Sequence, residues 1–287
     1  MRDPITLDRF RILGCSCGLA YTETHFGDVD RYYPGKYRTY GSVVTCLLGY
    51  LYDIRVSHWS RFRPSGGSIL EIGCGSGLML AAFRRRGWCV LGLERTEQMA
   101  EIGRRAHGLE IAAVPLEKLS KSASFDLIVL FNVLEHIDDP LSLLKECASR
   151  LAQNGLLIIV VPNFSSWQAR IAGPKWFHLD VPRHLIHFTP ETLRATLGRA
   201  GLKITSLGFA SPEHDPYGWV ESTISIITGR NNTLTRFLMG LDRFSPRTLL
   251  AFVLGALLLP AAVILAFTSW MAGRGALMEA RAVASSV

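Results

Sequence analysis

The sequence predicts a doubly wound α/β fold around a mainly parallel sheet. Between residues 69 and 209, short apolar runs of strand length alternate with longer segments whose apolar residues recur at helical spacing. Such alternation requires a parallel sheet with helices on both faces, because each helix must carry the chain back to the edge where the next strand begins. With 287 residues the chain can bury the core of one such domain.

The individual elements follow from this periodicity. A helix over 38–62 precedes the sheet, because its apolar residues are close to helical spacing. Thr189 and Pro190 are typical of a helix start and place the last helix of the core. We expect strands at 69–72, 89–94, 110–114, 125–131, 156–161 and 203–209, and further helices at 77–86, 96–106, 140–152 and 190–200.

A glycine-rich turn follows the first strand of this sheet. Glycine occupies every second position, at Gly73, Gly75 and Gly77, and the absence of a Cβ allows a tight turn that a ligand can touch. The carboxyl end of a first parallel strand is where a nucleotide-like cofactor binds in doubly wound sheets. Glu94 ends the second strand, roughly twenty residues further on, where an acceptor for ribose hydroxyls belongs. An NAD enzyme and a purely structural turn are the alternatives.

Two further features resemble the class I S-adenosylmethionine-dependent methyltransferases. The glycine spacing is G-x-G-x-G rather than the dinucleotide fingerprint G-x-G-x-x-G, and Leu-Glu-His-Ile-Asp-Asp-Pro follows the fourth strand at 134–140. The segment 176–190 is similar to a hallmark of a broad bacterial subfamily related to ubiquinone-biosynthesis O-methyltransferases. The resemblance covers about 68–208 and the tail after Arg274.

The resemblance implies a seven-stranded sheet, S-adenosylmethionine as cofactor, and a set of cofactor-binding residues. The last strand would be antiparallel, at 276–283. Glu71 and the glycine turn would hold the methionine end of the cofactor. Leu116 stands where many relatives have an aspartate, so apolar packing would hold the adenine. The residues that the resemblance assigns to cofactor binding are Glu71, Gly73, Gly75, Gly77, Glu94, Arg95, Leu116 and Asn132.

Transfer to a hydroxyl group calls for a general base, and three residues after the fifth strand are candidates for catalysis. They are Asp180, His184 and His187. The two histidines are three residues apart and would share a face of a helical turn. Three interpretations are open. One histidine acts as the base, both histidines brace a lid through hydrogen bonds, or the D-x3-H-x2-H pattern binds a cation. The acceptor pocket would be lined by His136, Trp176, Phe177 and Phe188, with a hydrogen bond at a helix start as the alternative for His136.

The chain divides into four segments. Residues 1–36 form an N-terminal arm, and 37–210 form the methyltransferase core. An insertion with hydrophobic, membrane-associating helices occupies 211–273, and 274–287 supply the last strand. The arm contains Cys15 and Cys17, a remnant of the two-pair zinc ribbon of relatives; four ligands are needed for a structural zinc site, so we assign no metal.

The insertion contains 249–267, 19 residues without a charge, which is long enough for a transmembrane helix. If the tail completes the sheet, both ends of this run must lie on the same side of a membrane. Pro260 near its middle would let it fold back. We therefore expect a re-entrant or interfacial helical hairpin, flanked by Arg243, Arg247 and Arg274. A true span with 273–287 outside the fold and a helix pair buried in a dimer remain alternatives.

Charge and cysteine content restrict the partners. The net charge is +7 and the pI is about 9.3, which suits an anionic membrane surface or a nucleic acid. Asn132 is followed by Val-Leu-Glu, not by the Pro-Pro-aromatic element of base-methylating enzymes, so we expect no nucleic-acid partner. No signal peptide is evident, and six cysteines form no extracellular framework. These features predict the cytoplasmic face of a membrane, contacted through about 248–272.

The sequence as a whole predicts a methyltransferase that uses S-adenosylmethionine. The apolar insertion favours O-methylation of a membrane-proximal or lipid-linked small molecule or glycan. A non-catalytic cofactor-binding membrane adaptor and an N- or C-methyltransferase of a soluble metabolite are the alternatives. The sequence is also compatible with a homodimer.

Overall fold

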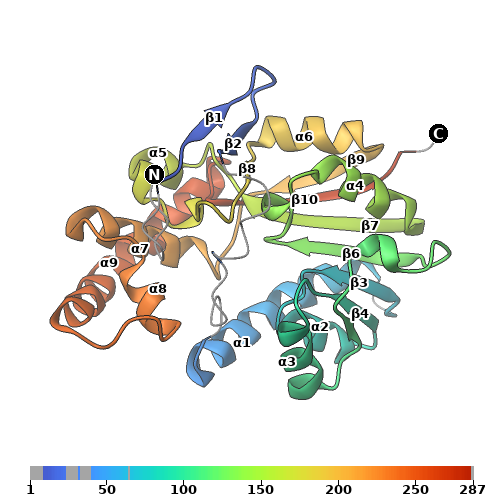
Figure 1. Ribbon diagram of the computed structural model, residues 1–287, viewed down its shortest axis with the longest axis horizontal. Helices are drawn as coiled ribbons and strands as arrows, with labels where there is room; N and C mark the ends of the chain where they lie inside the picture. The colour runs from blue at the N-terminus through green and yellow to red at the C-terminus, as the bar shows by residue number, and fades with distance from the viewer. Residues whose placement is uncertain (1–8, 24–31, 33–39, 64, 286–287) are drawn as a thin grey trace. The chain divides into compact units, whose positions relative to one another are not determined.

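The computed structural model describes residues 9–23, 32, 40–63 and 65–285 (Figure 1). Two compact units divide the chain. The first, here called the sheet unit, comprises Leu47–Val161, Leu193–Leu207 and Glu279–Val287. The second, the helical unit, comprises Met1–Cys46, Pro162–Thr192 and Gly208–Met278.

Part of the predicted N-terminal arm and the first residues of the helix predicted over 38–62 cannot be compared with the structure. Residues 1–8, 24–31, 33–36 and 38–39 lie outside the described residues.

The sheet unit is built on seven strands in the order β5-β4-β3-β6-β7-β10-β9. The first five positions in this order run parallel to one another. This arrangement confirms the predicted doubly wound, mainly parallel sheet. The strands are β3 (Ser68–Ile72), β4 (Cys89–Leu93), β5 (Ile111–Ala112), β6 (Phe125–Phe131), β7 (Leu151–Pro162), β9 (Leu202–Gly208) and β10 (Leu277–Ala284).

The last strand runs against its neighbour β9. Ser285 N donates to Gly201 O over 2.9 Å, and Thr205 Oγ1 donates to Arg281 O over 3.1 Å. The contacts therefore advance along one strand as they retreat along the other, which is the antiparallel pattern. The tail after the insertion thus completes the sheet, as predicted.

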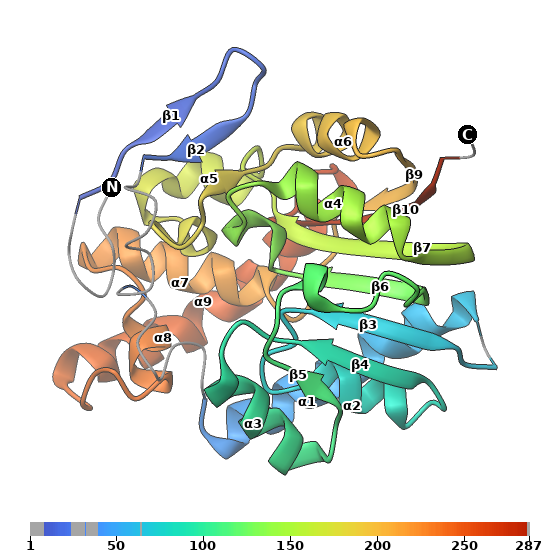
Figure 2. The same ribbon diagram turned by 45° about the vertical axis from the view of Figure 1, so that its right-hand side comes forward.

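Helices cover both faces of this sheet: α1 to α3 lie on one face, and α4 and α6 on the other (Figures 1 and 2). Trp59 at the end of α1 stacks on Phe83 of α2, and both are fully buried with Ile69 and Leu70 of β3. The helices are α1 (Ser42–Trp59), α2 (Leu78–Arg84), α3 (Glu97–His107), α4 (Pro140–Ser149) and α6 (Pro190–Arg199).

Several boundaries differ from the prediction, and two of these differences concern the ends of helices α1 and α4. The structure gives α1 from Ser42, and a separate 3-10 turn, η2 (Ser60–Phe62), follows it. The helix predicted over 140–152 ends at Ser149, because Leu151 already pairs with Phe125 at the start of β7. Strand pairing therefore overrides the helical periodicity there.

The helical unit contains a small antiparallel sheet and a group of helices. The sheet has the order β1-β2-β8, with β1 (Ile12–Gly14), β2 (Ala20–Thr22) and β8 (Ile186–His187). The connector after β7 contributes α5 (Trp167–Ala172) and the turns η5 (Gly173–Lys175) and η6 (Phe177–Leu179). The remaining helices are α7 (Asp215–Thr228), α8 (Thr233–Leu238) and α9 (Pro246–Met271).

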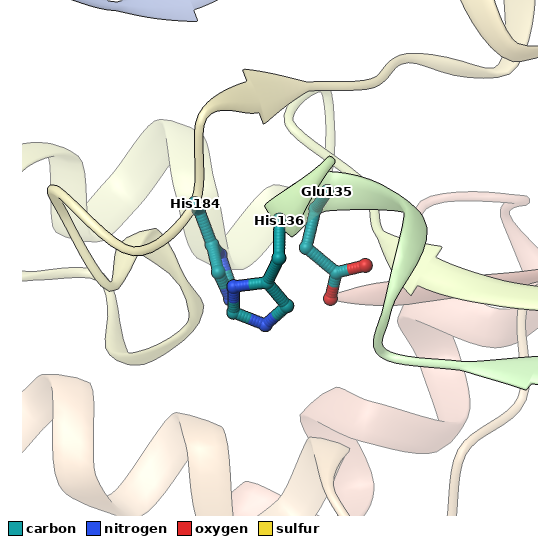
Figure 3. A group of neighbouring side chains, drawn as sticks. All are labelled: Glu135, His136 and His184. Atoms are coloured by element: carbon teal, nitrogen blue, oxygen red, sulfur yellow. The ribbon is translucent and has the colours of Figure 1, made fainter. Parts of the chain in front are cut away.

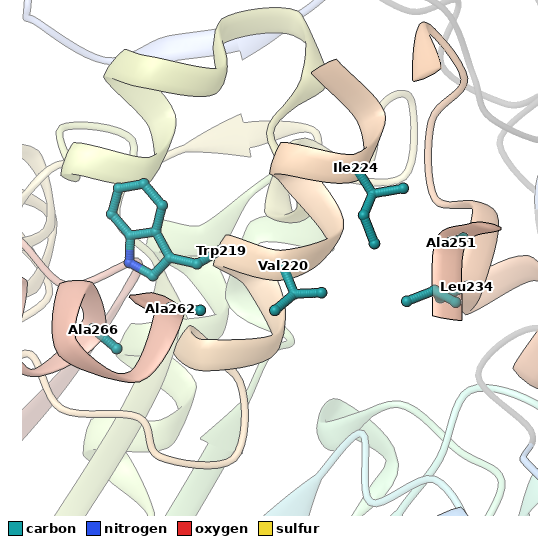
Figure 4. Packing of buried hydrophobic residues seen from close by; sticks show 7 residues of the cluster. All are labelled: Trp219, Val220, Ile224, Leu234, Ala251, Ala262 and Ala266. Atoms are coloured by element: carbon teal, nitrogen blue, oxygen red, sulfur yellow. The ribbon is translucent and has the colours of Figure 1, made fainter. Parts of the chain in front are cut away.

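The apolar run of the insertion forms a single helix, so the predicted helical hairpin is wrong. α9 continues for 26 residues through Pro260, and its N-cap Ser245 accepts a hydrogen bond from Thr248 N. A proline inside a helix removes only one backbone donor, and lateral packing can hold both sides in line. Ala251 before Pro260 and Ala262 after it belong to one buried cluster with α7 and α8 (Figure 4).

Candidate active site

The glycine turn after β3 is anchored on the neighbouring strand. Gly73 N and Cys74 N both donate to Leu93 O, at 2.7 and 3.1 Å. Gly73, Gly75 and Gly77 all have positive φ, between 53° and 76°, a region that side chains rarely adopt. The glycine spacing is therefore a backbone requirement of this turn.

The surroundings of the three glycines differ. A Cβ at Gly73 would lie 2.5 Å from Val133, and one at Gly77 would lie 2.5 Å from Leu109. These two glycines let the turn pack against the protein. A Cβ at Gly75 would meet nothing within 4 Å in the described part of the chain. Gly75 is thus the position where a ligand can reach the backbone.

Glu94 closes the turn from the end of β4. Its Oε2 accepts a hydrogen bond from Gly75 N, and its Oε1 accepts one from Arg95 N, each over 2.8 Å. The side chain is half-buried. Each carboxylate oxygen can accept a second hydrogen bond, so this side chain can hold the turn and still accept from a diol.

Glu71 is a buried carboxylate beside the same turn. Its Oε2 has no hydrogen-bond partner among the described residues. Burial, assisted by the nearby Glu94 carboxylate, raises the pKa of Glu71 to about 8. A cationic group placed here would offset the free-energy cost of ionising the buried Glu71 carboxylate. The ammonium and sulfonium groups of S-adenosylmethionine carry the charge that this environment lacks, so the residues fit this cofactor.

Asn132 offers a second buried acceptor at the end of β6. Its backbone is left-handed, with φ of 54°, and its N donates to Val160 O over 2.9 Å. Within the described residues, the side-chain Oδ1 is buried without a partner. A buried amide oxygen without a donor is costly, and a bound ligand that donates a hydrogen bond would satisfy it.

The other predicted residues of the sheet unit lie on short turns that follow its strands. Leu116 is buried in η3 (Leu116–Lys118), and Arg95 is exposed. His136 is half-buried in η4 (Leu134–His136), the turn after β6. Figure 3 shows its side chain and that of Glu135 leaving this turn, and also labels His184 of the connector.

In the helical unit, the connector holds a buried ion pair. Arg183 is fully buried; its Nε and Nη2 donate to Asp180 Oδ1 at 3.0 and 2.7 Å, and its Nη1 donates to Tyr32 O at 2.8 Å. His184 follows, with its Nε2 3.8 Å from Asp180 Oδ2. Sequence reasoning did not single out Arg183. The signal available was an arginine three residues after an aspartate within the segment 176–190.

His187 occupies a different environment from His184. It lies in β8, whereas His184 precedes that strand and closes a turn through its N, which donates to Asp180 O over 3.0 Å, so the predicted shared helical turn is wrong. Thr22 Oγ1 donates to His184 O over 2.6 Å and lies 2.8 Å from His187 Nε2. The hydroxyl has one proton, so Nε2 must donate to it. Burial lowers the pKa of His187 to about 4, which keeps the ring neutral.

The three predicted pocket aromatics pack inside the helical unit. Trp176 is clustered with Leu179, Val181 and other apolar residues. Phe177 meets the Tyr217 ring edge to face, with centroids 5.3 Å apart. Phe188 is fully buried. The structure therefore brings the aromatic residues and Asp180, His184 and His187 into the helical unit, and the predicted cofactor residues into the sheet unit.

Comparison with known proteins gives the family. Residues 51–207 match a family described as methyltransferase domain, which is more than half of the chain. This range includes the glycine turn, Glu94 and Asn132.

Curated relatives are similar over much of their length. A ubiquinone biosynthesis O-methyltransferase of Bordetella parapertussis is 30% identical over 190 residues, which cover 61% of this chain and 75% of the relative. One of the same name from Xanthomonas axonopodis pv. citri is 27% identical over 169 residues, which cover 54% of this chain and 70% of the relative.

A solved structure shares the fold. A SAM-dependent methyltransferase from Archaeoglobus fulgidus superposes with a TM-score of 0.53 at 19% identity, covering 82% of this chain and 93% of that chain. The sheet order, the glycine turn, the buried acceptors Glu71 and Asn132, which have unpartnered oxygens within the described residues, and the matched domain agree. The chain therefore belongs to the methyltransferase domain family and is an S-adenosylmethionine-dependent methyltransferase.

Proposed function

We propose that this enzyme transfers the methyl group to a hydroxyl of a membrane-proximal or lipid-linked small molecule or glycan. Two observations support the proposal. The relatives that align over most of their length are named as O-methyltransferases. The observation that carries the membrane-proximal acceptor is α9, a helix long and apolar enough to cross a membrane, most of which is not buried in the protein.

For cofactor binding we propose that different residues around the glycine turn bind different parts of the cofactor. Glu71, Gly73, Gly75 and Gly77 hold the methionine end, with Asn132 as a further acceptor, and Glu94 accepts from the ribose hydroxyls. Bound S-adenosylmethionine supplies a methyl group already activated by its sulfonium.

The adenine contacts complete this assignment. Leu116 packs against the adenine, and Arg95 lies beside the ribose-binding carboxylate. The residues of the chain supply position and exclusion of water rather than activation of the methyl group.

For the acceptor proton we propose His184 as the general base. Asp180 is committed to Arg183 through two hydrogen bonds, which suits a positioning role. His187 donates through Nε2 to Thr22, and its lowered pKa makes it a weak base at neutral pH. His184 lies beside the Asp180 carboxylate, which stabilises a positive charge on the ring. His184 is therefore the candidate best suited to accept the proton.

The acceptor pocket in this proposal comprises His136, Trp176, Phe177 and Phe188. Aromatic rings suit an apolar acceptor, because they bury a large area and can pack edge to face. The enzyme works at the cytoplasmic face of a membrane, which it contacts through about 248–272. Such a position gives access to an acceptor that does not leave the bilayer.

The proposed reaction is tested with methyl-labelled S-adenosylmethionine and membrane lipid extracts. The wild-type enzyme is expected to label a lipid-soluble product whose methyl group is bound to oxygen. His184→Asn should lower kcat by roughly a hundredfold or more, as loss of a general base does, with S-adenosylhomocysteine binding unchanged. His58→Asn, at an exposed position near the end of α1, is the control.

The other outcomes separate the alternatives. A water-soluble product labelled on nitrogen or carbon would replace the proposal with methylation of a soluble metabolite. Failure of the folded protein to bind S-adenosylhomocysteine in a calorimetric titration would indicate a non-catalytic adaptor. Full activity of His184→Asn would exclude His184 as the base.

A further inference from the structure

The fully buried residues of α9 are small, and most of its large apolar residues are exposed. The buried small residues of α9, together with Gly255, are here called the inward stripe: Thr248, Ala251, Gly255, Ala262, Ala266 and Ser269. Leu254, Leu258 and Trp270 are partly buried against the same cluster as Ala251, Ala262 and Ala266. The opposite face, here called the outward stripe, consists of exposed large residues at helical spacing: Leu250, Val253, Leu257, Ile264, Phe267 and Met271. A helix that packs in water has the reverse arrangement.

The outward stripe is exposed to an unusual degree. Leu257 is 73% exposed, Ile264 64% and Met271 76%. Only 17% of the most apolar 18-residue window of α9 is buried. Contiguous apolar patches of this size mark an interaction surface, whereas single exposed apolar residues do not. Small residues in the contact with other helices are typical of helices whose outer face meets lipid, because close packing replaces the hydrophobic drive there.

Protein lies against one side of α9 along most of its length. In the first half, a Cβ on Gly255 would lie 3.4 to 3.5 Å from Leu234 and Val220. In the second half, Ala262 and Ala266 share a buried cluster with Trp219 (Figure 4). At the end, Trp270 Nε1 donates to Asp215 Oδ2 over 2.5 Å. Protein therefore covers one side of α9 in both halves of the helix and leaves the outward stripe accessible along the same length.

Positive charge accompanies the outward stripe. Arg243 and Arg247 are exposed just before and within the first turn of α9. No aspartate or glutamate occurs in the sequence between Asp242 and Glu279. Asp242 is paired with Arg230 and Arg236, at 2.8 Å each. The start of the helix is thus basic, which complements an anionic surface.

We propose that α9 lies in the plane of an anionic phospholipid bilayer, with the outward stripe inserted and Arg243 and Arg247 on the lipid headgroups. The inward stripe remains on α7 and α8. This orientation extends the proposal of a membrane-proximal acceptor made above, and its functional meaning rests on that proposal. It is tested by lipid binding alone, so that its failure and a failure of the proposed reaction can be told apart.

The first experiment is sedimentation of the full-length protein with vesicles. Phosphatidylcholine vesicles that contain phosphatidylglycerol should carry the protein down, and phosphatidylcholine alone should do so less. The double substitution Leu257→Glu with Ile264→Glu should weaken binding at least roughly tenfold, because charges would enter the bilayer surface. Ile102→Glu, at an exposed apolar position of α3, is the matched control and should bind as wild type. S-adenosylhomocysteine titration of each variant checks that it is folded.

Arg243→Gln and Arg247→Gln test the charge. Each should weaken binding to the anionic vesicles by roughly fivefold and leave binding to neutral vesicles unchanged. Equal binding of wild type and the double glutamate variant, with intact cofactor binding, would overturn the proposal. So would a stable dimer, seen by sedimentation velocity, that the glutamates dissociate and that never binds vesicles.

Insertion depth distinguishes an in-plane helix from a span. Environment-sensitive labels on Leu250→Cys, Leu257→Cys and Ile264→Cys would be quenched by brominated lipids, in a background whose exposed cysteines are serine. An in-plane helix predicts similar, shallow depths at all three sites. The outer two sites are roughly 21 Å apart along the helix axis, so a span predicts clearly different depths and would overturn the in-plane arrangement.

Discussion

Helices α2 and α9 distribute their large apolar residues in opposite ways. α2 buries Leu80 and Phe83 completely in the sheet unit. α9 buries Ala251, Ala262 and Ala266 and leaves Leu257 exposed in the helical unit. Both helices are apolar, so hydrophobicity alone does not separate them. The two helices therefore differ in where these large residues lie: inside the protein in α2, and on its surface at Leu257 of α9.

Two buried carboxylates, Glu221 of the helical unit and Glu71 of the sheet unit, differ in their hydrogen bonding. Glu221 of α7 is fully buried and satisfied: it accepts from Tyr217 OH over 2.8 Å and from Leu234 N and Thr235 N over 3.2 Å each. This carboxylate caps the start of α8 and has a structural role. Glu71 in the sheet unit has one oxygen without a partner in the described residues. An unsatisfied buried acceptor beside the glycine turn suits a ligand, because a Cβ at Gly75 would meet nothing within 4 Å in the described residues.

The largest expected effect is the pH dependence of the free energy of unfolding that is due to Glu71, the carboxylate with an oxygen unsatisfied among the described residues. Its folded-state pKa of about 8 exceeds the ordinary value of 4.5, so the folded protein binds more protons than the unfolded chain between these values. The free energy of unfolding should therefore fall as pH rises through that window, by at most about 1.4 kcal/mol per pH unit. Glu71→Gln should remove this slope. Urea unfolding of both proteins without cofactor measures it, and parallel pH profiles would show that Glu71 is not held protonated by burial.

The next effect concerns Glu94, which we assign to the ribose. Glu94→Ala should weaken S-adenosylhomocysteine binding by roughly a hundredfold, because each hydrogen bond to a carboxylate contributes about 1.5–3 kcal/mol. The hydrogen bond from Gly75 N would be lost as well. Calorimetric titration measures the change, with Glu97→Ala at the exposed start of α3 as control. Undiminished binding would remove Glu94 from the site.

The two smallest expected effects come from one substitution on each face of α9. Ala262→Leu places a larger side chain in the buried contact and should lower the free energy of unfolding by about 1–3 kcal/mol. Ile264→Gln changes an exposed position and should alter it by no more than about 0.5 kcal/mol in the absence of lipid. Urea unfolding measures both. A larger loss for Ile264→Gln would mean that protein, not lipid, covers the outward stripe.

Much of the sheet unit could be predicted because its signals are local. The strand at 125–131 is apolar at every position except Asp126, and the turn at Gly73 needs glycine for its backbone whatever surrounds it. The end of α4 was missed because it depends on pairing between Leu151 and Phe125, which periodicity does not reveal.

The connector was less predictable, because its contacts join distant parts of the chain. His184 and His187 were expected on a helical turn, but β8 pairs with β2, so His187 lies in a strand. Thr22, which bridges the carbonyl of His184 and the ring of His187, precedes them by more than 160 residues. Nothing in the local sequence marks that threonine.

The sequence by itself determined the fold class, the glycine turn and the apolar character of 249–267, since these depend on residue type and spacing. Only the tertiary structure decided that Pro260 lies within one continuous helix and which of its faces is outward. The physical reason is that lateral packing of Ala251 and Ala262 on α7 and α8 holds the two halves in line. The fully buried residues that α9 contributes to that contact are small, and large side chains such as Leu257 and Ile264 remain exposed.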